Sequence, residues 1–197
     1  MRRKPRSAAR RSDRRAERGP RADGGRNSPL RTRAPSKRLA IAVAWRLRTD
    51  WGCVALLKRV ARHVALAEGL TGGVLSIAIV GQRAMARLHQ QFLGVAGATD
   101  VITFDLRGAD EAGRNRPRRG SADLNAEIVV CADVARRRAS PRTRRAQVAE
   151  LALYVAHGVL HLAGYDDDDP RDFVRMHARE DELLGALGVG PVFAARR

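Results

Sequence analysis

The chain has 197 residues, enough for one domain of about 150 residues with a substantial hydrophobic core. No apolar run approaches the roughly 18 to 20 residues of a membrane span, and nothing resembles the apolar region of a secretory signal. The two cysteines, Cys53 and Cys131, are far apart in the sequence, which argues against a disulfide scaffold and indicates core thiols. We therefore expect a cytoplasmic protein without a membrane partner.

The net charge of +17 is concentrated at the amino terminus. Residues 1–37 hold fourteen Lys or Arg and three acidic residues, a net charge of +11, and almost no aliphatic side chains. Such a segment cannot bury enough apolar surface to order itself, so we predict a disordered basic arm. The arm suits RNA or another polyanion through neutralisation of phosphates, and a solvated tail without a specific role is the alternative.

The hydrophobic pattern after the arm begins with strands and helices in alternation. Residues 38–45 have the length and apolar character of a strand. Residues 50–68 repeat apolar side chains at helical spacing, and Gly69 ends this helix. Residues 74–80 are a short apolar run, which predicts a buried strand, and residues 82–92 return to helical spacing.

The second half predicts two more strands and three more helices. Strands over 101–106 and 126–131 flank residues 107–123, which are rich in Gly, Arg and Asp and predict a flexible loop. The predicted helices cover residues 133–139, 147–162 and 170–187, the last of them opened by Pro170. This order predicts an α+β fold, a small mixed sheet of about four strands covered by helices. We expect one domain over residues 38–190 and a short tail over residues 191–197.

Two histidines on the predicted helix over 147–162 indicate a metal site. His157 and His161 are four residues apart, so they lie on one face of a helix and can bind one divalent ion, most often zinc. The rest of this helix is almost wholly apolar, and a buried unpaired imidazole pair is costly. Gly164 then breaks the helix, and Asp167, six residues after His161, can return as the third ligand. Three protein ligands leave a fourth position open for water, the arrangement of a catalytic rather than a structural zinc.

Several alternatives remain at this stage. The two histidines can be polar members of a packed helix without a metal. Asp166, Asp168 and Asp169 compete with Asp167 as third ligand, and at least one carboxylate of this run is expected only to cap the helix after it. Gly158 stands where zinc metalloproteases carry the glutamate of HExxH, which counts against a peptidase. The sequence contains no GxxxxGK[ST] or GxGxxG, so nucleotide-binding folds have no support.

The segments HGVLHLAGYDDDD and MHAREDELLGALG resemble the YbeY family of bacterial endoribonucleases and rRNA maturation factors. That family is marked by an H-G-x-L-H-L-x-G-Y-D-H signature and a downstream M-x-x-x-E-x-x-x-L helix. Residues 99–104, TDVITF, are similar to the family strand T-D-V-L-S-F, and residues 126–131, AEIVVC, resemble its strand G-[DE]-I-x-I-[CS]. The likeness covers roughly residues 38 to 188 and leaves the basic arm outside.

The resemblance implies a zinc-dependent endoribonuclease that cuts single-stranded RNA. It would act in rRNA maturation, at the 3′ end of 16S rRNA, and in ribosome quality control, with the small ribosomal subunit as partner. His157 would be catalytic through a metal-bound water, while the general base is unknown. Arg136 and Arg137 would contact the substrate together with the basic loop 114–119 and the arm. The alternative is a non-catalytic ribosome-assembly factor whose metal only stabilises the fold.

The chain departs from the family pattern at two positions. Asp167 stands where the family carries a third histidine, and its negative charge should leave a bound water less acidic than three neutral imidazoles would. Leu93 stands where the family carries an arginine before the Thr-Asp-Val segment. The candidates to replace that arginine are Arg83, Arg87, Arg136 and Arg137.

Overall fold

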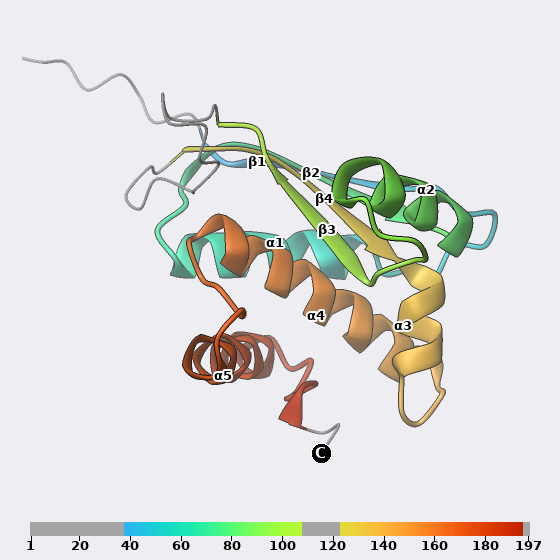
Figure 1. The fold of residues 1–197 in the computed structure, drawn as a ribbon. Helices are drawn as coiled ribbons and strands as arrows, with labels where there is room; N and C mark the ends of the chain where they lie inside the picture. The colour runs from blue at the N-terminus through green and yellow to red at the C-terminus, as the bar shows by residue number, and fades with distance from the viewer. Residues whose placement is uncertain (1–37, 108–122, 195–197) are drawn as a thin grey trace, which may run out of the picture. The chain divides into compact units, whose positions relative to one another are not determined.

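The computed structural model describes residues 38–107 and 123–194. The predicted basic arm, the loop 114–119 and the last three residues of the tail lie outside this range. The strands are β1 (Ala40–Trp45), β2 (Gly72–Val80), β3 (Val101–Asp105) and β4 (Asp123–Cys131). The helices are α1 (Val54–Ala67), α2 (Gln82–Leu93), α3 (Ala132–Arg138), α4 (Arg144–Leu162) and α5 (Pro170–Ala186), in the order that Figure 1 shows. The predicted α+β class and the order of elements are confirmed.

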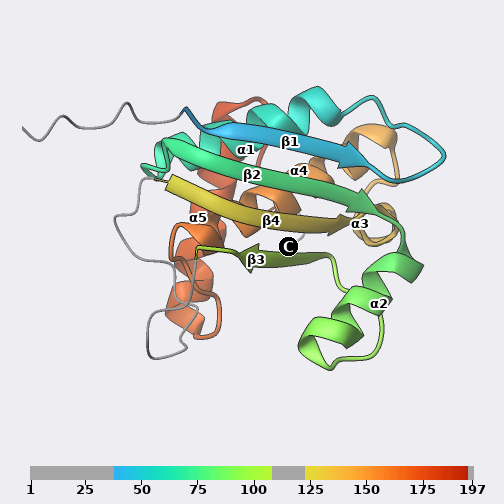
Figure 2. The same cartoon turned by 90° about the horizontal axis from the view of Figure 1, so that it is seen from above.

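The four strands form one mixed sheet in the order β1-β2-β4-β3 (Figure 2). β1, β2 and β4 are parallel, and β3 runs antiparallel to β4 at the edge. β2 and β4 pair without interruption from Gly72↔Asp123 to Val80↔Cys131. This pairing explains why β4 begins three residues before the predicted start at residue 126, since its polar first residues have backbone partners along the whole of β2.

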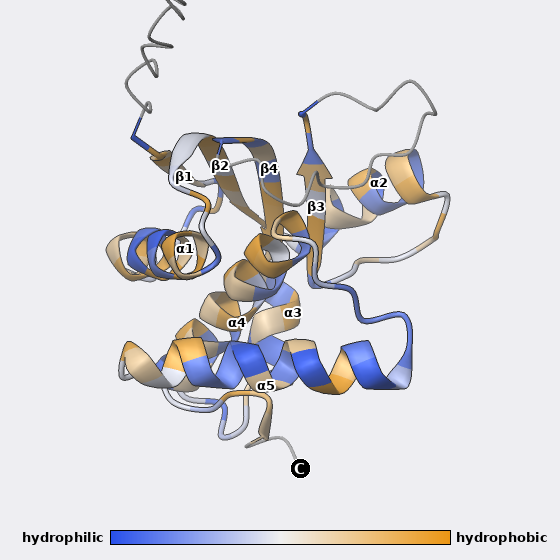
Figure 3. Cartoon of the chain, turned by 90° about the vertical axis from the view of Figure 1, so that its left-hand side faces the viewer, coloured by the Kyte–Doolittle hydropathy of each residue, from blue (hydrophilic) through white to orange (hydrophobic). Residues whose placement is uncertain are grey.

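The helices α1 and α4 cover one face of the sheet, and α5 packs against α4 on the side away from the sheet (Figures 1 and 3). α2 lies beside β3 at the edge of the sheet. Because α4 is enclosed between the sheet and α5, eleven of its residues are buried and it is apolar nearly all round. Among the described residues, no helix combines the length and apolar character that crossing a membrane requires.

Two helix starts differ from the predicted ones for local reasons. α1 begins at Val54 rather than at residue 50, because the Asp50 side chain accepts a bond from the Gly52 backbone N–H at 2.8 Å and holds a turn there. α4 begins three residues before the predicted start at residue 147, because the Thr143 hydroxyl accepts the N–H of Ala146 at 3.2 Å and caps the helix. Each turn or cap depends on one side-chain oxygen, which the hydrophobic periodicity does not reveal.

The cysteines are unpaired and buried, as predicted for core thiols. Burial, assisted by the charge of Asp50, raises the pKa of Cys53 to about 11. A thiol with that pKa stays protonated and unreactive at neutral pH. Cys53 and Cys131 are therefore ordinary members of the hydrophobic core.

Gly158 allows α4 to approach the sheet closely. A Cβ atom at this position would lie 2.9 Å from the hydroxyl oxygen of Thr103 on β3. It would also lie 3.0 Å from two side-chain carbons of Ile128 on β4. The absence of a side chain therefore sets how near the two histidines of α4 lie to β3.

Replacing Gly158 with alanine is expected to lower the free energy of unfolding by up to about 2 kcal/mol. The new methyl group overpacks the contact with Ile128, which costs roughly 1–3 kcal/mol, and the gain in helix propensity of about 1 kcal/mol offsets part of this. Gly185 of α5 is the matched control, because a Cβ there meets nothing within 4 Å. Gly185→Ala should be neutral or stabilising by up to about 1 kcal/mol. Urea unfolding of both variants measures this, and a stabilised Gly158→Ala protein would contradict the close packing.

Candidate metal centre and cleft

The carboxyl end of α4 is shaped by Gly164, whose φ of 94° lies in the left-handed region. Its N–H donates to the carbonyl of His161 at 2.9 Å, and the N–H of Tyr165 donates to the carbonyl of Leu160 at 3.0 Å. These two bonds form the Schellman motif that commonly ends a helix with glycine. The motif reverses the chain, so the residues that follow return toward the last turn of α4, where Asp167 lies beside the histidines.

The same turn orients the ring of His161. Its Nδ1 lies 3.1 Å from the carbonyl oxygen of Tyr165. Because a carbonyl only accepts, Nδ1 carries the proton of the neutral ring and donates it. The Nε2 atom of His161 is therefore left with a lone pair, which is the form that binds a metal.

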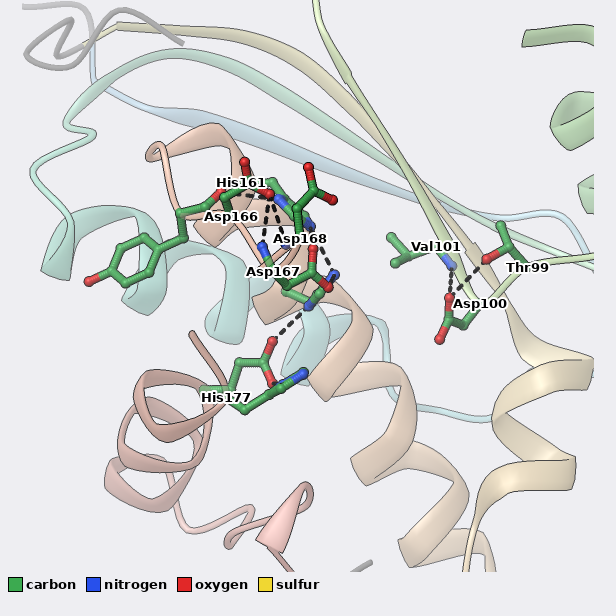
Figure 4. A network of polar contacts seen from close by, with 11 residues as sticks. Thr99, Asp100, Val101, His161, Asp166, Asp167, Asp168 and His177 are labelled. Atoms are coloured by element: carbon green, nitrogen blue, oxygen red, sulfur yellow. Dashed lines mark hydrogen bonds and ion pairs between the residues drawn. The ribbon is translucent and has the colours of Figure 1, made fainter. Parts of the chain in front are cut away.

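The ring of His157 is oriented by a buried carboxylate from α5. Its Nδ1 donates to Glu180 Oε1 at 2.8 Å, and Nδ1 of His177 donates to Glu180 Oε2 at 2.6 Å. Glu180 is completely buried, and the His177 ring stacks on Phe193 with 3.6 Å between the centroids. Figure 4 shows these contacts converging from α4 and α5. Two N–H donors thus hold the carboxylate, and Nε2 of His157 presents its lone pair to His161.

The Nε2 atoms of His157 and His161 lie 2.9 Å apart. Asp167 Oδ2 lies 3.8 Å from Nε2 of His157, and Asp167 Oδ1 lies 3.7 Å from Nε2 of His161. In a tetrahedral zinc site with bonds of about 2.0–2.1 Å, the ligand atoms lie about 3.3 Å from one another. Two lone pairs that face each other at 2.9 Å repel unless a proton or a metal cation lies between them. Distances and donor chemistry therefore both fit a zinc ion held by these three residues.

The neighbouring carboxylates have other partners. Asp166 accepts the backbone N–H groups of Asp167 at 2.8 Å and Asp168 at 3.3 Å, so it shapes the loop. Asp168 is exposed. Asp169 is the N-cap of α5, accepting two backbone N–H groups of its first turn. Of the four, Asp167 is the one whose carboxylate faces both histidines.

The pKa values of the two histidines are shifted in opposite directions. Burial by itself lowers the pKa of His157, but the hydrogen bond and charge of Glu180, with the charge of Asp167, raise it above the ordinary value of 6.5. Burial and the positive charge on His157 lower the pKa of His161 below 6.5. When the metal-free pair takes up a proton in addition to the two on its Nδ1 atoms, that proton therefore goes to His157 before His161, and a metal ion would compete with it.

The histidine pair opens into a cleft of about 820 Å³ between the end of α4, β3 and the start of α5. The charged residues among those that line it are Asp100, Asp105, Asp166, Asp172 and Arg175, with the two histidines. Arg107 pairs with Asp105 at 2.7 Å, and Arg175 pairs with Asp172 at 2.8 Å. From the residues that the structure describes, Asp100 accepts hydrogen bonds on one oxygen, from the hydroxyl of Thr99 and the N–H of Val101 (Figure 4).

The arginines predicted to contact the substrate do not line this cleft. Arg136 and Arg137 are exposed on α3, where Nη1 of Arg137 donates to the side-chain oxygen of Gln82 at 2.6 Å. Arg83 and Arg87 line a separate hollow at the start of α2. Leu93 does line the cleft and is 57% exposed.

Sequence reasoning missed the residues that support the site. Glu180 is the glutamate of the M-x-x-x-E-x-x-x-L pattern, which names the residue but not its role. That role has a signal, because Glu180 shares the buried face of α5 with Met176 and Leu184, where a carboxylate needs partners. Arg107 has none: it was assigned to a loop, yet its Nη2 donates to the carbonyl of Leu162 at 2.9 Å and helps to end α4.

Comparison with known proteins relates most of the chain to one family. The family model described as "Endoribonuclease YbeY" matches residues 49–188. A relative from Moorella thermoacetica with the same name is 33% identical over 139 residues, which are 69% of this chain and 87% of that protein. Another, from Anaeromyxobacter sp. (strain Fw109-5), is 40% identical over 134 residues, which are 68% of this chain and 64% of that protein.

For some other relatives, the aligned part of this chain covers a smaller share of the relative's length. It is 37% identical over 134 residues to "Endoribonuclease YbeY" of Myxococcus xanthus, and these residues are 43% of that protein. Among solved structures, the "Solution structure of TM1509 from Thermotoga maritima" aligns with a TM-score of 0.48 and 24% identity. That alignment covers 78% of this chain and 94% of the other.

Replacing Glu180 with glutamine is expected to lower the pKa of His157 in metal-free protein. The carboxylate favours the protonated ring, so the raised pKa contributes stability that is present below pH 6.5 and lost as the pH rises through the pKa of the folded protein. The amide carries no charge and accepts on one atom only, so this contribution should disappear. Histidine NMR titration in the presence of a chelator measures it.

The matched control for this titration is Glu182→Gln on the same helix, because Glu182 is 67% exposed and pairs with Arg179. The control should leave the pKa of His157 raised. A wild-type pKa of His157 below 6.5, or an equal drop in both variants, would show that Glu180 is not its partner in solution.

Proposed function

The chain belongs to the YbeY family of endoribonucleases, as its motifs predict, and on that premise we propose that it hydrolyses phosphodiester bonds in single-stranded RNA. One observation carries the proposal: two imidazole nitrogens and one carboxylate converge at the wall of a cleft, with both ring protons held on the far side. An ion held by these three side chains would keep a fourth coordination position open, which a structural zinc site does not do.

In this proposal one Zn²⁺ ion is held by Nε2 of His157, Nε2 of His161 and a carboxylate oxygen of Asp167. When bound, such an ion polarises water or a phosphate oxygen at its open position. Glu180 keeps the proton of His157 on Nδ1, and the carbonyl of Tyr165 does the same for His161. These two partners fix the direction of both lone pairs, so the rings need no reorientation when the metal binds.

The cleft itself would position the RNA. Three of its carboxylates are engaged, because Asp105 and Asp172 pair with arginines and Asp166 accepts backbone N–H groups. Asp100 keeps one oxygen without a hydrogen bond to any described residue, so we assign it as the candidate general base. Arg175, 54% exposed at the cleft, is the cation best placed to offset the charge of a phosphate there.

A peptidase is the weaker assignment for the same site. Position 158 faces β3 and β4 rather than the cleft, and even a methyl group there would meet Thr103 and Ile128. A glutamate at position 158, where metalloproteases carry their catalytic base, would therefore not fit in this packing. The packing at position 158 therefore favours phosphodiester over peptide hydrolysis.

We further propose that the RNA is ribosomal and that the enzyme matures the 3′ end of 16S rRNA. In this proposal it also acts in ribosome quality control with the small subunit, and it works in the cytoplasm. The second candidate function is a non-catalytic assembly factor with a structural metal. Leu93 favours it, because an exposed leucine lines the cleft where the family pattern has an arginine. Cleavage assays separate the two.

Asp167→Ala is expected to lower the affinity for Zn²⁺ by more than about a hundredfold. It removes a direct ligand, whereas loss of a residue that only orients a ligand typically costs about 10–100-fold. Asp168→Ala is the matched control, because that neighbouring carboxylate is exposed and should leave the affinity nearly unchanged. Competition with a chromogenic chelator gives both values. Equal losses in the two variants would refute Asp167 as the ligand.

Protein loaded with one zinc per chain is expected to cut single-stranded RNA, and His157→Ala should abolish the cutting while RNA affinity stays nearly the same. The histidine would hold the metal and make no phosphate contact. The readouts are gel analysis of a labelled RNA and its binding isotherm. Undiminished cleavage by His157→Ala would eliminate the proposed site, and a wild-type protein that binds zinc and RNA without cutting would favour the assembly factor.

A further inference from the structure

A dense basic surface lies at the other end of α4, outside the cleft. Residues 136–145 carry six arginines, at the end of α3, in the following turn and at the start of α4, and all six are exposed. No acidic residue occurs between Asp133 and Glu150, and Glu150 is buried. We call residues 136–145 the arginine turn. Its charge is +6 over ten residues, so it attracts polyanions strongly.

Two of these arginines are held in place by an aromatic ring. The guanidinium carbon of Arg144 lies 4.6 Å from the centre of the Trp51 ring, and that of Arg136 lies 5.7 Å from it. Both distances are within the range of a cation–π interaction. Trp51 therefore keeps the two like charges close together despite their repulsion, which orders the surface before any ligand binds.

Helix stability does not explain the arginines at the start of α4. Arg142, Arg144 and Arg145 lie at its N-terminus, and its first turn contains no acidic residue. Positive charge at a helix N-terminus opposes the helix dipole, by typically about 0.3–1 kcal/mol per charge. A phosphate at this position interacts favourably with both the guanidinium groups and the helix N-terminus. The arrangement therefore disfavours the free protein and favours an anion complex.

The arginine turn stands at a fixed distance from the candidate metal centre, because both belong to one buried helix. His157 and His161 follow Arg145 by 12 and 16 residues, which corresponds to about 18 and 24 Å along the axis at 1.5 Å per residue. One residue of the cleft wall is joined to the start of α3, since the carbonyl of Asp100 accepts the N–H of Cys131, the N-cap of α3.

We propose that the arginine turn binds the phosphate backbone of the RNA segment next to the one in the cleft. The proposal rests on the proposed function, since it assigns the cleft to RNA. At about 3.4 Å per phosphate, the spacing along one strand of a duplex, the interval between the two sites corresponds to at most roughly five to seven phosphates, and to fewer where the single strand is extended. RNA shorter than this interval reaches only the cleft, while longer RNA engages both sites. The affinity for long RNA thus comes mainly from the arginine turn, while cleavage takes place in the cleft.

The test compares full-length wild type with Arg138→Gln/Arg142→Gln/Arg145→Gln, three exposed side chains whose removal leaves the Trp51 contacts intact. Arg38→Gln is the control for loss of one charge, because Arg38 is exposed just before β1, at the opposite end of the parallel strands. Binding of a 20-nucleotide and a 4-nucleotide RNA is measured by fluorescence anisotropy with a chelator present, from 50 to 200 mM salt. Thermal melting checks that each variant is folded.

For the 20-nucleotide RNA, the triple variant should reduce the slope of log affinity against log salt by about 2, at roughly 0.7 per lost contact to a single strand. Its affinity near 0.1 M salt should fall roughly tenfold to a hundredfold. The 4-nucleotide RNA should bind both proteins equally, and Arg38→Gln should match wild type. Tryptophan emission offers a second readout, because Trp45 and Trp51 are the two tryptophans of the chain and their rings lie 5.5 Å apart. It should change on binding the long RNA only.

An unchanged slope in the triple variant would overturn the proposal and assign the surface to another partner, such as an acidic protein. An equal effect per charge in Arg38→Gln would also overturn it, because a diffuse charge effect would then suffice. The failure of the proposed function is distinguishable from both results. A protein that binds long RNA through the arginine turn but never cuts it retains this surface and loses only the catalytic assignment.

Discussion

Two neutral imidazoles whose lone pairs face each other at 2.9 Å cannot remain so without a cation between them, and the rest of the site is built around this constraint. Both ring protons are held on the outer nitrogens, one by the buried carboxylate of Glu180 and one by the carbonyl of Tyr165. The opposite pKa shifts of His157 and His161 are consistent with this constraint, because a positive charge on His157 disfavours a second one on His161.

The packing of α4 makes this constraint possible. The helix is buried between the sheet and α5, and Gly158 brings it against β3 and β4. In such a place a polar side chain needs a partner, so α5 supplies Glu180 and the Schellman turn supplies a carbonyl. The polar contacts that orient the histidines are therefore also contacts that attach α5 and the loop before it to the domain.

Charge is distributed unevenly between the two ends of α4. The carboxyl end lies beside Asp100, Asp105, Asp166 and Asp172, most of them already paired or hydrogen-bonded. The amino end carries the exposed arginine turn. An RNA that follows the helix would gain its affinity far from the reacting phosphate, which leaves the cleft free to be specialised for holding a metal ion. The leucine at position 93, where the family pattern has an arginine, is then easier to explain, because the arginine turn would neutralise RNA phosphates outside the cleft.

The sequence by itself determined the features that depend on local spacing. The order of strands and helices followed from hydrophobic periodicity, and the pairing of His157 with His161 followed from their four-residue spacing on a helix of 3.6 residues per turn. The glycine break, the signature segment and the family resemblance are local in the same sense. Helix starts that depend on a single side-chain oxygen, such as the cap by Thr143, escaped this reasoning.

Tertiary structure decided everything that depends on which distant groups meet. The sequence favoured Asp167 by its offset and its place in the signature but left Asp166, Asp168 and Asp169 as competitors, and the path of the reversed loop brings the carboxylate of Asp167 toward both histidines. Glu180 lies 23 residues after His157, and its role depends on how α5 packs on α4. The same packing brought Arg175 into the cleft and left Arg136 and Arg137 on an outer surface. Local spacing sets the direction of a side chain from its own element, whereas its partner is set by how separate elements pack.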